Sequence, residues 1–509
     1  MTSTSLLMLF AIVAYLAVVV GMGVYLARKN HTTEDFYLGG RKLGPFVTAM
    51  SAEASDMSSW LLMGLPGVAY VTGLADAAWT AIGLAVGTYV NWLVVARRLR
   101  HYTHECGNAT TLPLFFSNRY RDEKKILSVL AAALIIIFFV PYTASGFAAC
   151  GKLFSSLFGW DYLPAMIISA VVIVAYTTLG GFLAASTSDF LQSIIMTIAI
   201  IVVFGFGISN VGGLGAVIGN ARSMAGYFSL VQIHDPATGT AAPYGALTIA
   251  SMLAWGLGYF GMPHVLLRFM AIEDAEKLSL SRRVASIWVV ISMSVAIFIG
   301  VIGNAMTKVG TIPALSDAET IIITIADVIS RHGVLAALVA GVILAGILAA
   351  TMSTADSQLL AASSSASQNI LKEVLVKDMD EKTGMLVARV TVLIIAVIGM
   401  VIARDSNSSV FQIVSFAWAG FGASFGPLVL LALFWKRSNL QGALAGMLSG
   451  GVMVFVWKFL VRPMGGVLGI YELLPAFLVA LAVNVAVSLA TEEPSEEIQD
   501  EFDRVASMK

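Results

Sequence analysis

The chain has 509 residues, of which 58% are hydrophobic and only 12% are charged, and its mean hydropathy is +0.86. This composition excludes a soluble globular protein of ordinary surface and predicts an integral membrane protein. The formal net charge of −1 gives no indication of a nucleic-acid partner.

Thirteen apolar stretches are separated by short polar joints, and each is long enough to cross a bilayer, which takes roughly 20 residues. They predict an all-α polytopic membrane protein that is surrounded by lipid and has almost no soluble domain. The expected spans are 5–27, 44–71, 76–96, 126–150, 162–182, 189–209, 246–266, 285–307, 334–362, 384–403, 409–435, 441–461 and 472–490.

The distribution of basic residues predicts the orientation. The first stretch has no positive charge before it and no cleavage site after it, so we interpret it as a retained helix rather than a signal peptide. With the N-terminus outside, 23 of the 30 Lys and Arg residues fall in cytoplasmic joints, including the joint 268–283. The sequence therefore favours an outside N-terminus and a cytoplasmic C-terminus. The acidic tail 492–503 is expected to be a short solvated terminus.

Two spans contain residues that interrupt a membrane helix. The second span has a polar centre from Ser51 to Trp60 and continues through Gly64-Leu-Pro-Gly67, and the seventh has three glycines and a proline from Trp255 to Pro263. Because broken helices at matching positions are typical of inverted repeats, we expect a five-plus-five architecture. The alternative is that Gly and Pro only allow close helix packing. The expected units are 1–43, 44–245, 246–437 and 438–509.

A polar stripe on the ninth span could bind a cation. Ala350, Ser353, Thr354 and Ser357 fall at i, i+3, i+4 and i+7, so they share one helix face. A hard cation such as sodium prefers oxygen ligands, which this stripe could supply together with unwound carbonyls near Ala54 and Met57 of the second span. The alternative is that the hydroxyls only bond their own or a neighbouring helix.

Four acidic residues lie within predicted spans, where a charge is costly and usually functional: Glu53, Asp56, Asp189 and Asp356. None has a basic partner four residues on. Asp56, on the broken second span, is the strongest candidate for organising a cation site. Asp189 is either interfacial or buried, and Asp356 either serves a second cation or faces a vestibule.

Aromatic residues near the breaks indicate a substrate cage, because they combine apolar faces with hydrogen-bonding tips. They are Trp60, Tyr142, Trp255 and Tyr259. Isolated membrane Trp and Tyr residues more often lie at the bilayer interface, but Tyr142 is too deep for that.

Other chemistry has little support in the sequence. A possible metal cluster has only three ligands, His101, His104 and Cys106, and no second group of ligands elsewhere in the sequence completes it. No transition metal is therefore expected. No phosphate-binding glycine loop and no nucleophile elbow is present, so we expect neither ATP-driven transport nor an enzyme. No cofactor is implied.

Several motifs resemble the solute:sodium symporter family, and the resemblance extends from about residue 5 to 490. The motifs are Phe36–Arg41, Ser51–Gly67, Trp255–Phe269, Met352–Thr354 and Phe416–Gly426. Within the family the likeness is to bacterial carriers of L-proline. The resemblance implies thirteen helices with a leucine-transporter-like inverted repeat, a place in the bacterial plasma (inner) membrane, sodium as the co-transported ion and no obligatory protein partner.

The resemblance also implies roles for individual residues. Sodium would be held by the backbone oxygens of Ala54, Met57 and Ala350 and the hydroxyls of Ser353 and Thr354. Asp56 is similar to an acid needed for sodium use, and Arg41 to a cytoplasmic arginine that affects coupling. In some relatives an acid like Asp189, with residues placed like Asp356 and Ser357, forms a second sodium site. Proline would be bound near Ser58, Trp60, Tyr142, Trp255, Tyr259 and Pro263.

The substrate stays open between proline and another small solute, because Glu53, Ser59 and Met262 depart from the pattern of the proline carriers. The alternatives are pantothenate, a sugar or a betaine-like osmolyte. Outside the symporters, the sequence could be a membrane sensor module or an ion channel, but its short tail carries no kinase domain.

Overall fold

The computed structural model describes residues 2–28, 32–376, 379–407 and 409–508, and in this part of the chain it is almost entirely helical. The predicted all-α class is confirmed. The helices are α1 (Ser3–Ala27), α2 (Thr33–Leu38), α3 (Pro45–Asp56), α4 (Leu65–Thr72), α5 (Leu74–Val90), α6 (Ala96–Glu105), α7 (Leu112–Arg119), α8 (Ile126–Phe158), α9 (Tyr162–Val211), α10 (Leu214–Ser223), α11 (Ala246–Leu253), α12 (Pro263–Ala271), α13 (Leu278–Lys308), α14 (Ile321–Ser330), α15 (Val334–Ser364), α16 (Glu381–Ile402), α17 (Val410–Phe434), α18 (Leu440–Val456), α19 (Leu473–Ala490) and α20 (Glu496–Ser507).

Short segments of tighter or wider helix join several of these elements. The 3₁₀ segments are η1 (Gly39–Arg41), η4 (Ala254–Gly261), η5 (Ala275–Lys277), η6 (Ala318–Thr320), η9 (Arg462–Met464) and η10 (Gly466–Leu468), and the π-helical segments are η2 (Trp60–Gly64), η3 (Asn91–Val95), η7 (Ser365–Leu375) and η8 (Trp457–Val461). The strands β1 (Gln232–Asp235) and β2 (Thr240–Pro243) form an antiparallel hairpin in which Gln232 pairs with Pro243.

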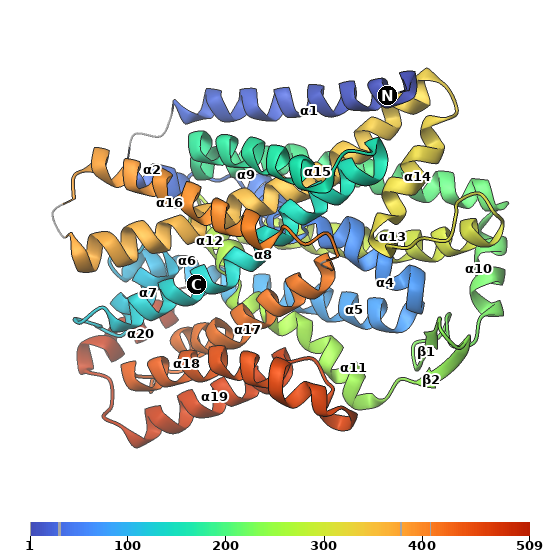
Figure 1. The fold of residues 1–509 in the computed structure, drawn as a ribbon. Coiled ribbons are helices and arrows are strands. Elements are labelled where there is room, and N and C mark those ends of the chain that lie inside the picture. The colour runs from blue at the N-terminus through green and yellow to red at the C-terminus, as the bar shows by residue number, and fades with distance from the viewer. Residues whose placement is uncertain (1, 29–31, 377–378, 408, 509) are drawn as a thin grey trace.

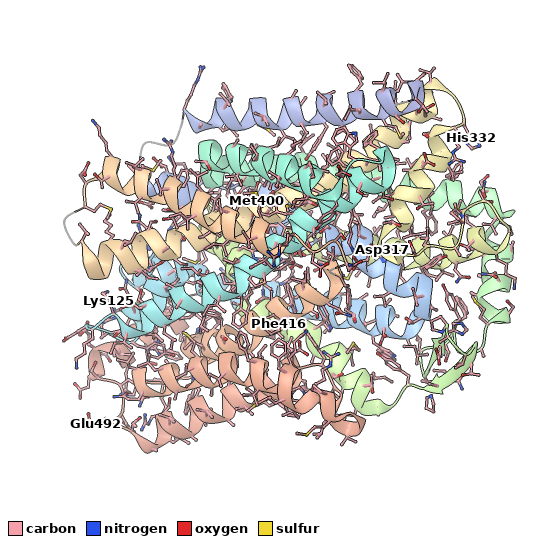
Figure 2. The ribbon with its side chains drawn as sticks, viewed as in Figure 1. Lys125, Asp317, His332, Met400, Phe416 and Glu492 are labelled. Atoms are coloured by element: carbon pink, nitrogen blue, oxygen red, sulfur yellow. The ribbon has the colours of Figure 1, made fainter. Side chains whose placement is uncertain are left out.

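The long helices form one bundle with two distinct ends. In Figure 1, α1 lies along one edge of the bundle, and α18 and α19 lie along the opposite edge. The hairpin and α10 gather at one end, which we call the hairpin end, and α2, α7 and α20 gather at the other, the α20 end. Figure 2 places Asp317 and His332 toward the hairpin end and Lys125 and Glu492 at the α20 end.

Within the described residues, ten helices are long and apolar enough to cross a membrane. Three shorter apolar helical stretches overlap three further predicted spans: Trp60–Thr72, Tyr162–Thr178 and Ala246–Gly261. Two of these are the spans expected to be broken. The count of thirteen stays a prediction, whereas the multi-pass character does not depend on it.

The fifth and sixth spans are joined differently from the expectation. The sequence predicts a polar joint at 183–188, but these residues are helical and belong to α9. The chain turns instead at Gly181, whose φ of 64° interrupts the helical run. Glycine adopts this left-handed φ without the steric cost of a Cβ atom.

The lipid bilayer explains why apolar side chains lie on both sides of these helices. Phe10 in α1 is 66% exposed and Ile398 in α16 is 46% exposed, because these faces point out of the bundle.

Toward the interior, α5 and the broken segment η4 approach through glycines. A Cβ atom on Gly256 would collide with the carbonyl oxygen of Gly83, and one on Gly87 would collide with that of Gly256. This contact requires residues without side chains.

We therefore expect Gly256→Ala to destabilise the protein. The added methyl group overpacks a backbone contact, and overpacking typically costs about 1–3 kcal/mol. Thermal unfolding in detergent should show a midpoint several degrees lower. The control is Gly205→Ala, because the corresponding Cβ in α9 would meet nothing within 4 Å. Equal midpoints for the two variants would contradict the proposed contact.

Candidate functional site

The second span is broken just after Asp56. Helix α3 ends at Asp56, Met57 has a ψ of 70°, and the chain resumes as η2 from Trp60. Three of the four residues from Asp56 to Ser59 are Asp or Ser, and such residues bond to nearby backbone groups outside helices. Backbone oxygens near the end of α3 are consequently freed in the bundle interior.

The seventh span is broken over a longer stretch. Helix α11 ends at Leu253, η4 continues as a 3₁₀ segment to Gly261, and Met262 is extended with φ −79° and ψ 106°. Pro263 then occupies the first turn of α12, where its missing N–H would have no helical partner anyway. The two breaks expected from the sequence are confirmed.

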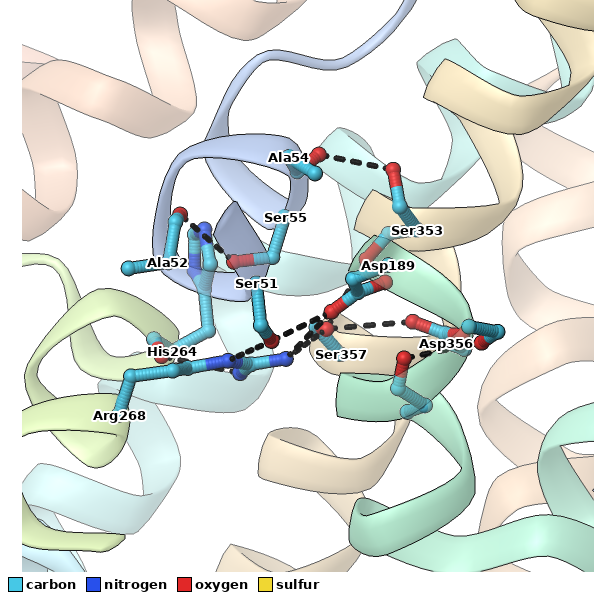
Figure 3. Close-up of polar contacts among 12 residues, drawn as sticks. Ser51, Ala52, Ala54, Ser55, Asp189, His264, Arg268, Ser353, Asp356 and Ser357 are labelled. Carbon is cyan, nitrogen blue, oxygen red and sulfur yellow. Dashed lines mark hydrogen bonds and ion pairs between the residues drawn. The ribbon is translucent and has the colours of Figure 1, made fainter. Parts of the chain in front are cut away.

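Four of the five predicted sodium-binding residues converge on one point. The Ser353 hydroxyl donates to the Ala54 carbonyl over 2.8 Å and lies 3.2 Å from that of Ala350, and the Thr354 hydroxyl lies 3.5 Å from the Ala54 carbonyl. All four residues are at most 3% exposed. Figure 3 shows the contact between Ala54 and Ser353.

These groups have the right chemistry for a small hard cation. A hydroxyl that rotates can turn its lone pairs toward a cation, and unwound carbonyls are the oxygens that bind sodium in carriers with broken helices. Met57, the fifth predicted residue, directly follows α3 at the non-helical ψ, so its carbonyl does not continue the hydrogen bonding of that helix.

Asp56 joins the two broken spans. Its carboxylate oxygen Oδ2 accepts a hydrogen bond of 2.6 Å from the Tyr259 hydroxyl of η4. Its carbonyl accepts from Trp60 Nε1 and from the Tyr142 hydroxyl of α8, both over 3.2 Å. In the described part of the chain Oδ1 has no partner. Asp56 therefore connects the end of α3 to three of the predicted substrate residues.

The predicted aromatic residues form a cluster with two others. The ring of Trp255 lies 6.3 Å from Trp60 and 4.9 Å from Tyr471, and Tyr259 lies 5.0 Å from Trp418. The indole of Trp418 donates to the Trp255 carbonyl over 2.8 Å.

The sequence did not predict that Trp418 and Tyr471 belong to this cluster. Trp418 lies in one of the family-like motifs, but the loop that carries Tyr471 gave no signal. Of the remaining predicted substrate residues, Ser58 lies in the break and accepts from the Trp60 amide over 3.3 Å. Pro263 begins α12.

A cavity lies between the aromatic cluster and the hairpin end. It has a volume of about 450 Å³ and is lined by residues that include Gly64, Gly67, Lys152, Asp317, Glu319 and Phe411. The Phe411 ring lies 5.5 Å from Trp255, so one wall of the cavity touches the cluster. Lys152 forms ion pairs with Glu319 and Asp317 at 2.8 and 2.9 Å. The cavity thus has charged side chains in its lining.

Arg268 is a site residue that the sequence interpretation missed. It was placed in a cytoplasmic joint, but it lies in α12 with its side chain only 1% exposed. Its guanidinium contacts Asp189 at 3.2 Å, Ser357 at 2.6 Å and Ser51 at 3.0 Å, as Figure 3 shows. This cluster joins α3, α9, α12 and α15 beside the Ala54–Ser353 contact.

The cluster includes two of the acidic residues that the sequence placed within spans, Asp189 and Asp356. The side chain of Asp189 is 0% exposed and accepts from the Ser51 hydroxyl over 2.6 Å, so it is buried rather than interfacial. Asp356 is also buried and accepts from the Ser357 hydroxyl over 3.1 Å. Arg268 therefore pairs with Asp189 directly and is linked to Asp356 through the Ser357 hydroxyl.

Arg41 lies outside this cluster but is tied to α12. It donates to the Met270 carbonyl over 2.6 Å and to the Ala109 carbonyl over 2.7 Å. Burial, and secondly the nearby guanidinium of Arg100, lowers the pKa of Arg41 to about 10, so it remains charged at neutral pH. Arg41 thereby connects the α20 end of α12 to the segment between α6 and α7.

Comparison with known proteins identifies relatives over almost the whole chain. The model of the sodium:solute symporter family matches residues 36–450. A sodium/proline symporter of Staphylococcus aureus is 40% identical over 477 residues, which cover 92% of this chain and 90% of the relative. A sodium/proline symporter of S. aureus strain USA300 is 38% identical over 501 residues, covering 97% and 94%.

Two solved structures share the fold. One is the substrate-bound, outward-open state of a sodium-coupled sialic acid symporter, with a TM-score of 0.79, 17% identity, and coverage of 96% of this chain and 99% of that one. The other is a nucleobase-cation-symport-1 family transporter in a closed conformation, with a TM-score of 0.52, 14% identity, and coverage of 93% and 99%. The expected leucine-transporter-like fold is confirmed.

The ion pair between Arg268 and Asp189 predicts that the effects of these two charges on stability are strongly coupled. Arg268→Gln leaves the Asp189 carboxylate buried without its ion-pair partner, which typically costs about 3–5 kcal/mol. The double variant Arg268→Gln, Asp189→Asn removes both charges and should recover most of that loss. Thermal unfolding of both single variants and the double variant in detergent measures the coupling. Additive losses would show that the pair does not contribute as described.

Proposed function

Because the chain belongs to the sodium:solute symporter family, we propose that it couples the entry of sodium to the uptake of L-proline by alternating access. It is a transporter rather than an enzyme, and sodium is its co-transported ion. The observation that carries the proposal is the convergence of the Ala54 carbonyl with the hydroxyls of Ser353 and Thr354 at the break in the second span.

In the proposed site, sodium binds between α3 and α15. Its ligands are the carbonyls of Ala54, Met57 and Ala350 and the hydroxyls of Ser353 and Thr354. Sodium replaces the hydrogen bond that Ser353 donates to Ala54, so the same oxygens that hold the two helices together then hold the ion. Asp56 is not among the proposed ligands and organises this site through the bond of its Oδ2 atom to Tyr259.

The substrate binds on the other side of the break. The aromatic faces of Trp60, Tyr142, Trp255 and Tyr259 enclose the apolar ring of proline. Its carboxylate is suited to the start of a half-helix, near Ser58 or Pro263, because that end carries partial positive charge. The sodium/proline symporters named above support proline as the substrate.

Coupling follows from the short connection between the two sites. A cation at Ala54 fixes the end of α3, and Asp56 two residues later holds Trp60, Tyr142 and Tyr259. Sodium therefore raises the affinity for substrate, and substrate raises the affinity for sodium by the same factor. Asp189 and Arg41 act in this coupling by fixing Arg268 and the end of α12.

A second candidate is sodium-coupled uptake of another small solute. Glu53, which departs from the proline-carrier pattern, is buried and accepts a hydrogen bond of 2.9 Å from Trp92. Met262, which also departs, is fully buried at the second break. These substitutions favour a site of altered shape, for pantothenate, a sugar or a betaine-like osmolyte.

The proposed setting is the plasma (inner) membrane of a bacterium, with the N-terminus outside and the C-terminus inside. The chain divides into a leading segment 1–43, two inverted repeats 44–245 and 246–437, and a closing segment 438–509. The helix α6, which carries Arg97 and Arg98, lies toward the α20 end (Figure 1), and Arg98 contacts Phe502 of α20. These basic residues support a cytoplasmic position for that end. The cycle requires no cofactor and no obligatory protein partner.

Uptake into proteoliposomes tests the substrate. Radiolabelled L-proline should accumulate only when a sodium gradient is directed inward, and excess unlabelled proline should compete. A panel with pantothenate, glucose and glycine betaine distinguishes the second candidate. Sodium-dependent uptake of one of these solutes without competition by proline would replace proline as the substrate.

A substitution on α15 tests the sodium site. Thr354→Ala removes one of five proposed ligands, and a loss of about 1.4 kcal/mol raises the half-saturating sodium concentration about tenfold. The matched control is Thr351→Ala, because the Thr351 hydroxyl donates to its own helix at Ile347. Initial uptake rates measured against sodium concentration give the result. An unchanged sodium dependence in Thr354→Ala would exclude this residue as a ligand.

A further inference from the structure

The C-terminal helix α20 is packed against the bundle, contrary to the expected solvated tail. Its side chains Ile498, Phe502 and Val505 are 7%, 7% and 3% exposed. Glu501 lies on the same face and is 5% exposed. These residues recur every three or four positions, so the acidic tail is an amphipathic helix whose apolar face is covered.

Phe502 is held between the helices α6 and α7. Its ring lies 4.8 Å from the guanidinium of Arg98 in α6 and 5.4 Å from that of Arg119 in α7. Arg98 also lies over the ring of Phe434, the last residue of α17, at 5.0 Å. Cation–π contacts of this kind therefore join α20, α6 and α17 at one point.

Ion pairs fix the helix on both sides of Phe502. Arg121, which follows α7, contacts Glu501 at 2.8 Å and Glu497 at 2.9 Å. Lys436, which follows α17, contacts Asp503 at 2.5 Å. The acidic residues of α20 thus bind two separate connections of the bundle, which lie more than 300 residues apart in the chain.

The two spans joined by α20 flank the broken seventh span. Helix α5 continues through η3 into α6, and both α5 and α17 pack against η4. On the α5 side the contact is the glycine approach at Gly256, and on the α17 side it is the hydrogen bond from Trp418 to Trp255. A separation of α6 from α17 at the α20 end would open the bundle beside this break.

We propose that α20 is a latch that ties α6 to α17, holds the α20 end of the carrier closed, and releases when that end opens. The proposal goes beyond sodium-coupled uptake, because it assigns a conformational role to a segment outside both inverted repeats. The latch consists of the Phe502 contact with Arg98 and Arg119 and the ion pairs of Glu501 and Asp503.

A native thiol reports on the latch. Cys106, at the end of α6, is 1% exposed. Burial, and secondly the negative charge of Glu501, raises the pKa of this thiol to about 12, so it is not ionised at neutral pH. Because the thiolate is the reactive form, Cys106 is doubly protected from maleimide while α20 is docked.

The first experiment measures maleimide labelling of Cys106 in purified protein that carries Cys150→Ser and is either full-length or truncated after Pro494. In sodium-containing buffer, we expect the chain that ends at Pro494 to be labelled at least tenfold faster than the full-length protein. We expect full-length Glu501→Gln to be labelled several-fold faster. Asp500→Asn is the matched control, since Asp500 is exposed on the opposite side of α20. Monodisperse elution from a sizing column shows that each variant is folded.

The second experiment separates a latch from a passive cover. Spin labels are placed at His104→Cys in α6 and at Gln441→Cys at the start of α18, the helix that follows α17, in a background without native cysteines. They report the distance between α6 and the connection from α17 to α18. We expect the distance to lengthen by several ångströms in the truncated chain and to be unchanged in Asp500→Asn. Faster labelling of Cys106 with an unchanged distance would show that α20 only covers the surface, and equal labelling rates would show that it does neither. Neither readout requires transport, so the result does not depend on the identity of the solute.

Discussion

A backbone group that leaves a helix inside a bilayer has no water to bind, and this constraint determines the arrangement of the whole centre of the molecule. The break after α3 frees carbonyls that the surrounding helices must satisfy. Ala54 is bonded by Ser353, and Asp56 by Trp60 and Tyr142. At the second break Trp255 is bonded by Trp418. Each of these partners is a side chain from another helix or from beyond the break, so both breaks are stabilised by tertiary contacts.

Close packing of the broken segments makes those contacts reachable. The segment η4 has glycine where α5 approaches through Gly83 and Gly87, and Gly261 lies against the Phe421 carbonyl of α17. A side chain at these positions would push the neighbouring spans apart. The aromatic rings would then lose contact with the break, because hydrogen-bond geometry tolerates only a few tenths of an ångström. The small residues of the seventh span are therefore as important to the site as its polar residues.

The sequence predicted what depends on local pattern. The polar and glycine-rich runs located both breaks, and the i, i+3, i+4 spacing placed Ser353 and Thr354 on one helix face. It could not predict the partners of Arg268, because these lie 79, 89 and 217 residues away. The residue also stands at the edge of the basic joint 268–283, so it was counted among the loop cations. The docking of α20 was missed for the same reason, since the partner of Glu501 is 380 residues distant. A charged residue in a sequence is expected at a polar surface. Whether it is buried depends on a partner of opposite charge that is distant in the sequence, which a local pattern does not reveal.

The position of Arg268 has a consequence for how the centre of the carrier can move. A buried ion pair is strongly disfavoured when one partner is removed, because the remaining charge is left in a medium of low dielectric constant. Arg268 belongs to the half-helix α12, whereas Asp189 and Ser357 belong to α9 and α15. Any motion that separates α12 from these two helices must either carry water to the charges or supply another cation. In the broken seventh span, α12 is thus held by electrostatics, whereas η4 is held against α5 and α17 by close packing. The electrostatic contact is the one whose strength a nearby cation can change.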